Sequence, residues 1–366
     1  MMAWVRRQMD ALRGRGEAAP TVPPMDGVLK PNTLLEAARQ LIRVEAPDNL
    51  VMSSQSILFS SGNTVHVLDA ATGSARELRR FDHVVSCLAA GDAGLLAAGL
   101  DDGSIHLWAS NRESVALTTL GSQRLVCPTA LAFRAASTLI VCQGSMHSKP
   151  SQWKHDLMQR GASGSVWAVS LNDQSSRKLA GALAFPNGIA LSDAGIVVSE
   201  SWRHRLLRLS DAGTVPMLAD LPGYPGRLSV SADGGHWLSV FAPRSQLIEF
   251  VLRETEYRER MVRELDPEHW ISPTLAPARS FLEPMQGGAL RTHGVMKPWA
   301  PTRSYGLLIR LDAEFRPIES YHSRADGTHH GVTSALEVGP QVLVASQGGN
   351  AILALNPDAQ VRGVRP

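Results

Sequence analysis

The chain is poor in the residues that mark several large classes of protein. Its 366 residues include only three cysteines, Cys87, Cys127 and Cys142. Each lies in or beside an apolar run, where a buried free thiol is the usual outcome, so we do not expect a disulfide framework. The 36 basic and 34 acidic residues leave a formal net charge of +2. No overall field therefore attracts nucleic acid or an anionic membrane, and small molecules or proteins remain as partners.

The N-terminal segment also lacks a continuous apolar run. Met1–Pro20 carries several arginines but no stretch typical of a secretory signal or a transmembrane span. We therefore expect a cytoplasmic protein. Trp4, Val5, Met9 and Leu12 fall on one helical face, which would suit a membrane surface or a partner. An arm that packs on the rest of the chain, or that is disordered, is the alternative.

One stretch of the sequence reads as a complete β-meander. Phe185–Leu209 contains a short apolar strand, an Asp-Ala-Gly turn, a second apolar strand and an alternating third strand. Comparable segments recur about forty residues apart, a spacing typical of propeller blades with four short strands each. In the other segments, the positions equivalent to Asn187 are Asp48, Ser86, Thr129, Gly226 and Gly331.

The last interval between repeats is long enough for one blade plus an insertion. From Arg253 to Thr302 the alternating pattern stops and prolines break up any long element, with one helix expected near Glu254–Leu265. A shorter excursion, Ser145–Gly164, separates the second and third strands of blade three. We predict an all-β, six-bladed propeller with four-stranded antiparallel blades over residues 45–366. A partly helical arm covers residues 1–44, and insertions interrupt blade three and, at about 253–304, blade five.

An ordered series of motifs resembles a known family. Phe185-Pro-Asn-Gly188, Glu200-Ser-Trp-Arg203, Ala219–Pro225 and Ser231–Trp237 are similar to the strictosidine-synthase-like branch of six-bladed propellers. The resemblance runs from about Glu45 to the C-terminus. It implies a relationship to gluconolactonases, senescence-marker-type lactonases and paraoxonases, most of which hydrolyse lactones or esters with a divalent ion in the central channel. Strictosidine synthase instead condenses an amine with an aldehyde, using an acidic residue and no metal.

A second resemblance competes with the first. Gly99–Trp108 is similar to the third strand of a WD-repeat blade, which would make the chain an interaction scaffold. The other repeats lack recurring Trp-Asp or Gly-His pairs, so we favour the first resemblance.

The repeat also predicts which residues surround the channel. The innermost strands converge at the axis, so their first residues form a ring at one end. We expect Asp48, Ser86 and Thr129 to contact substrate, together with His293 from the insertion. The catalytic candidates are His330, a possible base because imidazole titrates near neutrality, Arg227, a possible anion or oxyanion partner, and Thr333. By the resemblance, the catalytic acid of strictosidine synthase would fall near Thr333, where this chain has no carboxylate.

The family pattern also implies a metal site. Glu45, before Ala-Pro, and Asn187, before Gly, match two of the family's ligands, whereas Thr129 and Gly226 replace an Asn and an Asp. Calcium prefers several carboxylates, so the loss of the Asp weakens the case for a calcium ion. Arg227 follows the missing Asp, and its charge would substitute for the cation.

These observations give three functional hypotheses. The first is a hydrolase of small lactones or esters in the central channel, with a divalent cation, calcium, as a doubtful cofactor. The second is a non-catalytic propeller that binds a ligand or a protein. The third is metal-free condensation or lyase chemistry. The fold by itself does not decide among them.

Overall fold

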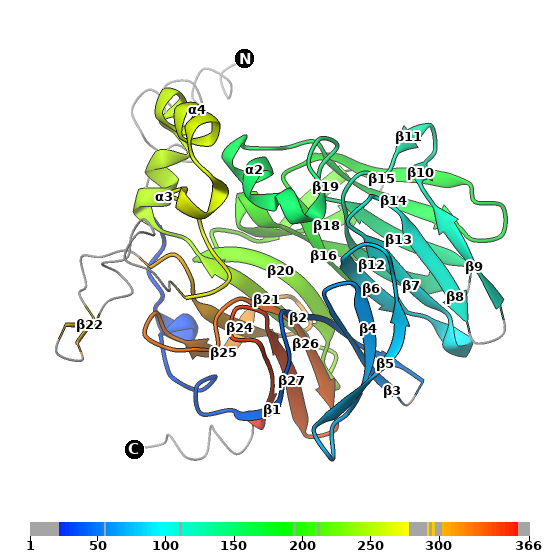
Figure 1. Ribbon diagram of the computed structural model, residues 1–366, viewed down its shortest axis with the longest axis horizontal. Helices are drawn as coiled ribbons and strands as arrows, with labels where there is room; N and C mark the ends of the chain where they lie inside the picture. Colours follow the sequence, from blue (N-terminus) through cyan, green and yellow to red (C-terminus); the bar gives the residue numbers. More distant parts are fainter. Residues whose placement is uncertain are drawn as a thin grey trace.

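Six four-stranded antiparallel sheets form a closed ring in the part of the chain that the structure describes. The computed structural model describes residues 22–54, 56–109, 112–135, 137–192, 195–210, 213–277, 291–292, 295–296 and 302–357. The predicted six-bladed propeller with four-stranded antiparallel blades is confirmed (Figure 1). The arginine-bearing segment Met1–Pro20 and the predicted substrate residue His293 lie outside the described residues.

The first three blades are continuous in sequence. Blade one contains β2 (Pro47–Ser53), β3 (Ser56–Ser61), β4 (Thr64–Asp69) and β5 (Ser74–Arg80). Blade two contains β6 (Val85–Ala90), β7 (Leu96–Leu100), β8 (Ile105–Ala109) and β9 (Arg112–Leu117). Blade three contains β12 (Pro128–Ala135), β13 (Thr138–Gln143), β14 (Gly164–Ser170) and β15 (Ser176–Leu183). The short hairpin β10 (Thr119–Leu120) and β11 (Gln123–Arg124) joins blades two and three.

Blade four is also continuous, whereas blade five is interrupted. Blade four contains β16 (Pro186–Ser192), β17 (Gly195–Glu200), β18 (Arg205–Ser210) and β19 (Gly213–Leu218). Blade five contains β20 (Gly223–Val230), β21 (His236–Pro243), β24 (Gly306–Leu311) and β25 (Pro317–Ser323). The insertion between β21 and β24 carries α3 (Gln246–Val251), α4 (Thr255–Glu264) and the short hairpin β22 (Arg291–Thr292) and β23 (Val295–Met296). It therefore begins before Arg253, where the sequence pattern placed its start.

The sixth blade is completed by the N-terminal part of the described chain. It contains β26 (Val332–Val338), β27 (Gln341–Ser346), β28 (Ala351–Leu355) and β1 (Arg39–Arg43). β1 pairs antiparallel with β28 and forms the outer strand. The predicted arm, residues 1–44, therefore contains the outer strand of blade six, which was expected within residues 45–366. The repeat could not reveal the pairing, because β1 and β28 lie at opposite ends of the sequence.

The hydrophobic core is divided among the spaces between neighbouring blades. Alternating residues of each strand face opposite sides of the blade, so each blade buries apolar side chains against both neighbours. For example, Leu58 and Val65 of blade one pack with Leu88 and Ala98 of blade two. A separate apolar cluster joins the insertion helices to α2 (Trp153–Met158) of the blade-three excursion. The core thus holds the inner strands in a fixed ring around the axis.

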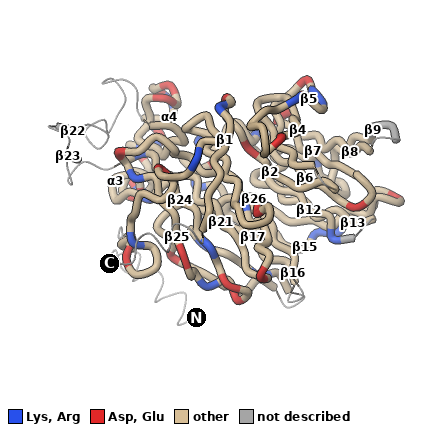
Figure 2. The backbone as a smooth tube through the Cα atoms, turned by 90° about the horizontal axis from the view of Figure 1, so that it is seen from below, with Lys and Arg blue, Asp and Glu red and all other residues tan. Residues whose placement is uncertain are grey.

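The surface charge is mixed. Figure 2 shows basic and acidic residues interspersed over the blades, which agrees with the small net charge of the sequence. Within the described ranges, no helix is both long enough and apolar enough to cross a lipid bilayer.

A carboxylate fixes the segment that leads into β1. Glu36 accepts hydrogen bonds from the Ser323 hydroxyl, from the backbone N–H groups of Thr328 and His329, and from the Thr328 hydroxyl. Partial burial alone would raise the pKa of the Glu36 carboxyl above its ordinary value of 4.5. The hydrogen bonds have the opposite and larger effect together, and the resulting pKa is about 2. The ionised carboxylate therefore stabilises the closure of the ring.

We expect Glu36→Gln to lower the free energy of unfolding at pH 7 by about 1–2 kcal/mol, because the amide replaces a charged acceptor of several hydrogen bonds. The folded-state pKa is below the unfolded value, so the contribution of Glu36 is complete above about pH 4.5 and is lost as the pH falls toward 2. Urea titrations across this pH range would measure the difference. Glu77→Gln, at an exposed pair with Arg80, is the control. An equal loss in both variants would contradict a specific role of Glu36.

Candidate functional site

Five of the six inner strands present their second residue to one cavity at the axis. These residues are Asp48, Ser86, Thr129, Asn187 and Thr333. Blade five contributes Gly226 and Arg227, which lie further along β20. The cavity, called the axial cavity below, has a volume of about 290 Å³.

Gly331 was expected to represent blade six in this ring, but that register is wrong by two residues. Gly331 precedes β26 and does not line the cavity, and Thr333 takes the place instead. Gly331 has a φ of 63° and belongs to the turn that leads into β26. The repeat matched this turn residue to residues that lie inside the other inner strands.

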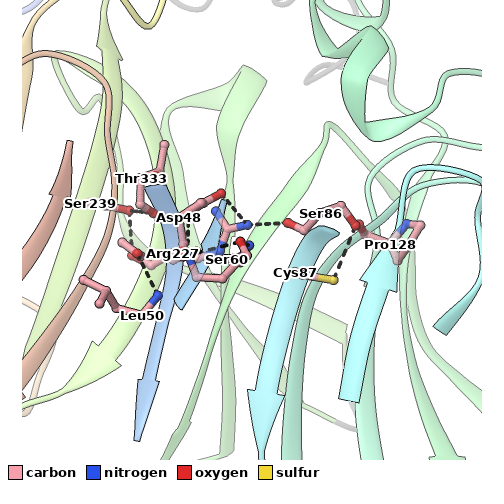
Figure 3. A network of polar contacts seen from close by, with 11 residues as sticks. Asp48, Leu50, Ser60, Ser86, Cys87, Pro128, Arg227, Ser239 and Thr333 are labelled. Carbon is pink, nitrogen blue, oxygen red and sulfur yellow. Dashed lines mark hydrogen bonds and ion pairs between the residues drawn. The ribbon is translucent and has the colours of Figure 1, made fainter. Parts of the chain in front are cut away.

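Arg227 crosses the channel. Its Nη2 donates a hydrogen bond of 2.5 Å to the carbonyl oxygen of Ser86 and lies 3.1 Å from Oδ2 of Asp48 (Figure 3). Successive inner strands contact one another around the ring, and β26 contacts β2, so blade two stands opposite blade five. Arg227 thus links blade five to blades one and two across the axis. Its side chain is only 18% exposed, which strengthens the ion pair relative to one on an open surface.

Side-chain hydroxyl groups join neighbouring blades around the axis. The hydroxyl of Ser86 donates to the carbonyl of Pro128 at 2.7 Å, and that of Thr129 donates to the carbonyl of Pro186 at 2.5 Å. Between blades five and six, the Ser239 hydroxyl donates to the carbonyl of Thr333 at 2.8 Å. The hydroxyl protons of Ser86 and Thr129, both predicted substrate contacts, are therefore already used by the ring.

Some polar side chains at the axial cavity have no hydrogen-bond partner among the described residues and remain free for a ligand. Thr333 is buried, and its Oγ1 has no hydrogen-bond partner among the described residues. The side-chain amide of Asn187 likewise makes no hydrogen bond to any residue in the described ranges. A buried hydroxyl without a partner is costly, so a ligand or water at this position would stabilise it.

Aromatic side chains form one wall of the axial cavity. Trp153, Phe185 and Phe241 line it. The ring of Phe185 stacks on Trp202 with 4.5 Å between centroids, and the rings of Trp153 and Phe241 meet edge to face at 5.7 Å. Trp202 donates from Nε1 to Oδ1 of Asp156 at 2.7 Å, which fixes the wall to the blade-three excursion. The wall suits an apolar or aromatic portion of a ligand.

A carboxylate also holds the blade-three excursion over the cavity. Asp101, in the turn after β7, accepts hydrogen bonds from the backbone N–H of Ser151 at 2.7 Å and from its hydroxyl at 2.8 Å. Asp101, Ser151 and Trp153 all line the cavity. The excursion is therefore part of the site. The sequence predicted that this excursion, with its aromatic residue Trp153, helps to shape the pocket. Trp270 of the second insertion is instead buried, and its Nε1 donates to the carbonyl of Leu265.

Two predicted site residues lie away from the cavity. His330 is fully buried, with Nδ1 at 2.8 Å from the Ser304 hydroxyl and Nε2 at 2.8 Å from the Arg324 carbonyl. Burial lowers the pKa of its imidazole. Both ring nitrogens are used, so the structure does not support His330 as a base. Glu45 is exposed and does not line the cavity.

Nor can the buried thiol next to Arg227 act as a nucleophile at neutral pH. Burial raises the pKa of Cys87 to about 11, and the nearby Arg227 offsets this only in part. Cys87 is a free cysteine, as are Cys127 and Cys142.

The residues at the axis do not fit a resident divalent cation. Glu45 is absent from the cavity, Gly226 has no side chain to coordinate, and Asp48 already pairs with Arg227. No group of three or more His, Cys, Asp or Glu residues within the described ranges could hold a metal ion. The Arg227 guanidinium also adds a positive charge at the axis, which disfavours a cation there. The predicted metal roles of Glu45 and Asn187 therefore have no support from this geometry.

We expect the unmodified protein to show no saturable calcium binding below about 1 mM, because Asp48, the carboxylate at the axis, already pairs with Arg227. Arg227→Ala should raise the calcium affinity, since it leaves Asp48 without a counter-ion. Isothermal titration calorimetry would measure both. Micromolar binding to the unmodified protein that disappears in Asn187→Ala would contradict this prediction. Gly226→Asp is a less clean test, because a Cβ at position 226 would lie 2.9 Å from the Ser239 hydroxyl.

Comparisons with known proteins agree with the fold. No family model matches the chain. A strictosidine synthase-like protein of Arabidopsis thaliana is 32% identical over 25% of this chain and 27% of its own length. The adipocyte plasma membrane-associated protein of Danio rerio is 24% identical over 61% of this chain and 60% of its own length. The chain therefore matches less than two thirds of the length of these relatives.

Solved structures of similar shape include two bacterial propellers. A gluconolactonase of Xanthomonas campestris superposes with a TM-score of 0.55 at 13% identity, covering 89% of this chain and 93% of that structure. A calcium-binding regucalcin of Agrobacterium tumefaciens superposes with a TM-score of 0.52 at 14% identity, covering 87% and 92%. At such low identity this likeness shows the fold alone. The resemblance to strictosidine-synthase-like and gluconolactonase-like propellers is confirmed.

Proposed function

We propose that this six-bladed propeller, which resembles strictosidine-synthase-like and gluconolactonase-like proteins, hydrolyses a small lactone or ester in its axial cavity without a resident divalent cation. The observation that carries the proposal is the pairing of Asp48 with Arg227 at the axis. A carboxylate and a guanidinium next to the unpartnered Thr333 hydroxyl supply the two functions that acyl hydrolysis needs. These are a proton acceptor for water and a donor for an oxyanion.

Arg227 has donors to spare. Only its Nη2 takes part in the contacts with Ser86 and Asp48, and its Nε and Nη1 make no hydrogen bond to any residue that the structure describes. These groups can bind the carbonyl oxygen of a substrate. Their hydrogen bonds strengthen as negative charge develops on that oxygen, which is the condition for lowering the barrier rather than only tightening binding.

The proposed hydrolysis is an attack of water on the acyl carbon of the substrate. Asp48 accepts a proton from water as the water oxygen forms a bond to the acyl carbon, and the carbonyl electrons move to the oxygen held by Arg227. When the tetrahedral oxyanion collapses, the bond between the acyl carbon and the ring or ester oxygen breaks. The leaving oxygen takes the proton from Asp48. The product carboxylic acid then releases its proton to solvent water, and the resulting carboxylate pairs with Arg227. Asn187 and Thr333 hydrogen-bond the substrate's other polar atoms.

The aromatic wall suggests what the rest of the substrate is. Trp153, Phe185 and Phe241 line the same cavity as these polar groups and would cover an apolar or planar part of the molecule. Its binding would exclude water from the ion pair and strengthen the electrostatic interactions there.

A non-catalytic ligand-binding protein is the second candidate, and one observation favours it. Asp48 is already neutralised by Arg227, and no histidine of the described residues lines the axial cavity to replace it as a base. Such a protein would bind a carboxylate at Arg227 without turning it over. Strictosidine-type condensation has less support. Glu337, the carboxylate nearest to Thr333 in the sequence, accepts hydrogen bonds from Ser231 and from Trp237 Nε1 and does not line the cavity.

Hydrolysis can be tested by pH-stat assay of a panel of γ- and δ-lactones and aryl esters in the presence of a chelator. We expect activity to persist in the chelator. Asp48→Asn should lower kcat by roughly 10²- to 10⁴-fold, because it removes the proton acceptor. Arg227→Lys should lower kcat by about 10²- to 10³-fold, since an ammonium group cannot hold both Asp48 and the oxyanion with a planar fork.

Arg80→Ala is the matched control, because it removes an arginine from an exposed pair on the outer strand of blade one and should leave kcat unchanged. Activity that is abolished by the chelator would overturn the metal-free proposal. No turnover of any substrate, together with saturable binding of carboxylates that Arg227→Lys weakens, would establish the second candidate instead.

A further inference from the structure

A second cavity lies on the other side of Arg227. It is lined by the later residues of the six inner strands and has a volume of about 370 Å³. Among the described residues, Arg227 is the one that lines both this cavity and the axial cavity. Its side chain is therefore a partition across the channel. We call the second cavity the axial tunnel.

The open end of the axial tunnel is apolar. Each inner strand contributes one apolar residue near its end: Met52, Ala90, Phe133, Leu191, Val230 and Leu336. All six are partly or largely exposed, and Val230 reaches 57%. Ala90, Phe133, Leu191 and Leu336 also pack against the apolar clusters between blades, whereas Met52 and Val230 are exposed. The exposed apolar side chains, beside an otherwise largely apolar lining, form a surface that an apolar ligand can cover.

The closed end of the axial tunnel is polar. Arg227 offers the Nε and Nη1 groups that have no acceptor among the described residues. Asn49 also lines this end; it is 1% exposed, and its Oδ1 has no hydrogen-bond partner in the described ranges. The remaining donors of Arg227 can take a further acceptor, and Asn49 Oδ1, an acceptor that water would satisfy, adds to the polar character of this end. The tunnel therefore changes from polar and charged at Arg227 to apolar at its mouth.

We propose that the axial tunnel binds a carboxylic acid with an unbranched alkyl chain, head first. The carboxylate binds the Arg227 guanidinium, and the chain extends along the apolar residues toward the mouth. The positive charge of Arg227 repels a cationic head group. A neutral head group would make no ion pair with Arg227. A short polar acid is disfavoured, because it would leave the apolar residues at the mouth of the tunnel exposed to water. Both proposals use Arg227, but the residues that would bind the alkyl chain lie outside the axial cavity, so chain binding can be tested apart from the hydrolysis.

Isothermal titration calorimetry of the full chain with hexanoate, octanoate and decanoate tests the proposal. We expect saturable binding to one site, with an affinity that rises about four-fold for each added methylene group, as burial of an alkyl chain requires. 1-Decanol should bind more weakly than decanoate by roughly 10- to 100-fold, because it lacks the charge that pairs with Arg227. Arg227→Gln should remove most of that difference.

Two variants at the mouth locate the site. Leu336→Asp places a carboxylate on the wall of the tunnel and should weaken decanoate binding at least about ten-fold. Val230→Asp, at an exposed position, should also weaken decanoate binding, and it replaces Leu336→Asp in the test if that variant does not fold. The matched control is Ile318→Asp, which introduces the same charge at a 43% exposed position on β25, away from the tunnel, and should leave decanoate binding unchanged.

Trp153→Ala separates this proposal from the proposed hydrolysis. It alters the wall of the axial cavity and should impair ester turnover while leaving decanoate binding unchanged. Decanoate binding that is lost in Trp153→Ala but retained in Leu336→Asp and Val230→Asp would place the alkyl chain in the axial cavity and overturn the proposal. An affinity that does not vary with chain length, or no saturable binding at all, would also overturn it.

Discussion

The closed ring depends on the pairing of β1 with β28. Each blade buries its two faces against its neighbours, so an incomplete last blade would expose the apolar side chains that blade one and blade six share. The N-terminal strand completes that blade, and Glu36 holds the segment before it against Thr328 and His329. Because the inner strands are positioned only by their neighbours around the ring, the shape of the channel depends on this closure.

Within the ring, Arg227 determines what the channel can do. Its guanidinium stands at the axis, paired with Asp48 and bonded to Ser86 on the opposite blade. A fixed positive charge here disfavours a metal ion and favours an anion. It also divides the channel into the axial cavity, with polar groups and an aromatic wall, and the axial tunnel, with an apolar mouth. The proposed hydrolysis and the proposed binding of alkyl carboxylates both follow from this one side chain, although they use different walls.

The hydroxyl groups at the axis illustrate how a propeller uses polar residues for its own assembly. Ser86, Thr129 and Ser239 each donate to a carbonyl of the next blade. A polar residue that faces the axis is therefore not automatically available to a ligand. The groups that remain available are those without a partner in the next blade, of which Thr333 and Asn187 are the clearest.

The repeat in the sequence determined the blades, because apolar alternation and tight turns are local properties that every blade must have. It also placed Asp48, Ser86, Thr129 and Asn187 on the inner strands, since residues at the same position of a repeat occupy equivalent places in a closed ring. The position predicted for blade six, Gly331, was wrong, because this turn residue was matched to residues that lie inside strands.

Contacts between distant parts of the chain required the tertiary structure. The pairing of β1 with β28 joins opposite ends of the described chain, and the contact of Arg227 with Asp48 crosses the ring. Whether His330 is a base or a buried structural residue depends on Ser304 and Arg324, which reach it from other segments. A sequence fixes which groups are present and their local periodicity. Only the closed ring decides which of them are used by neighbours and which face the channel, because those contacts depend on distances in space rather than along the chain.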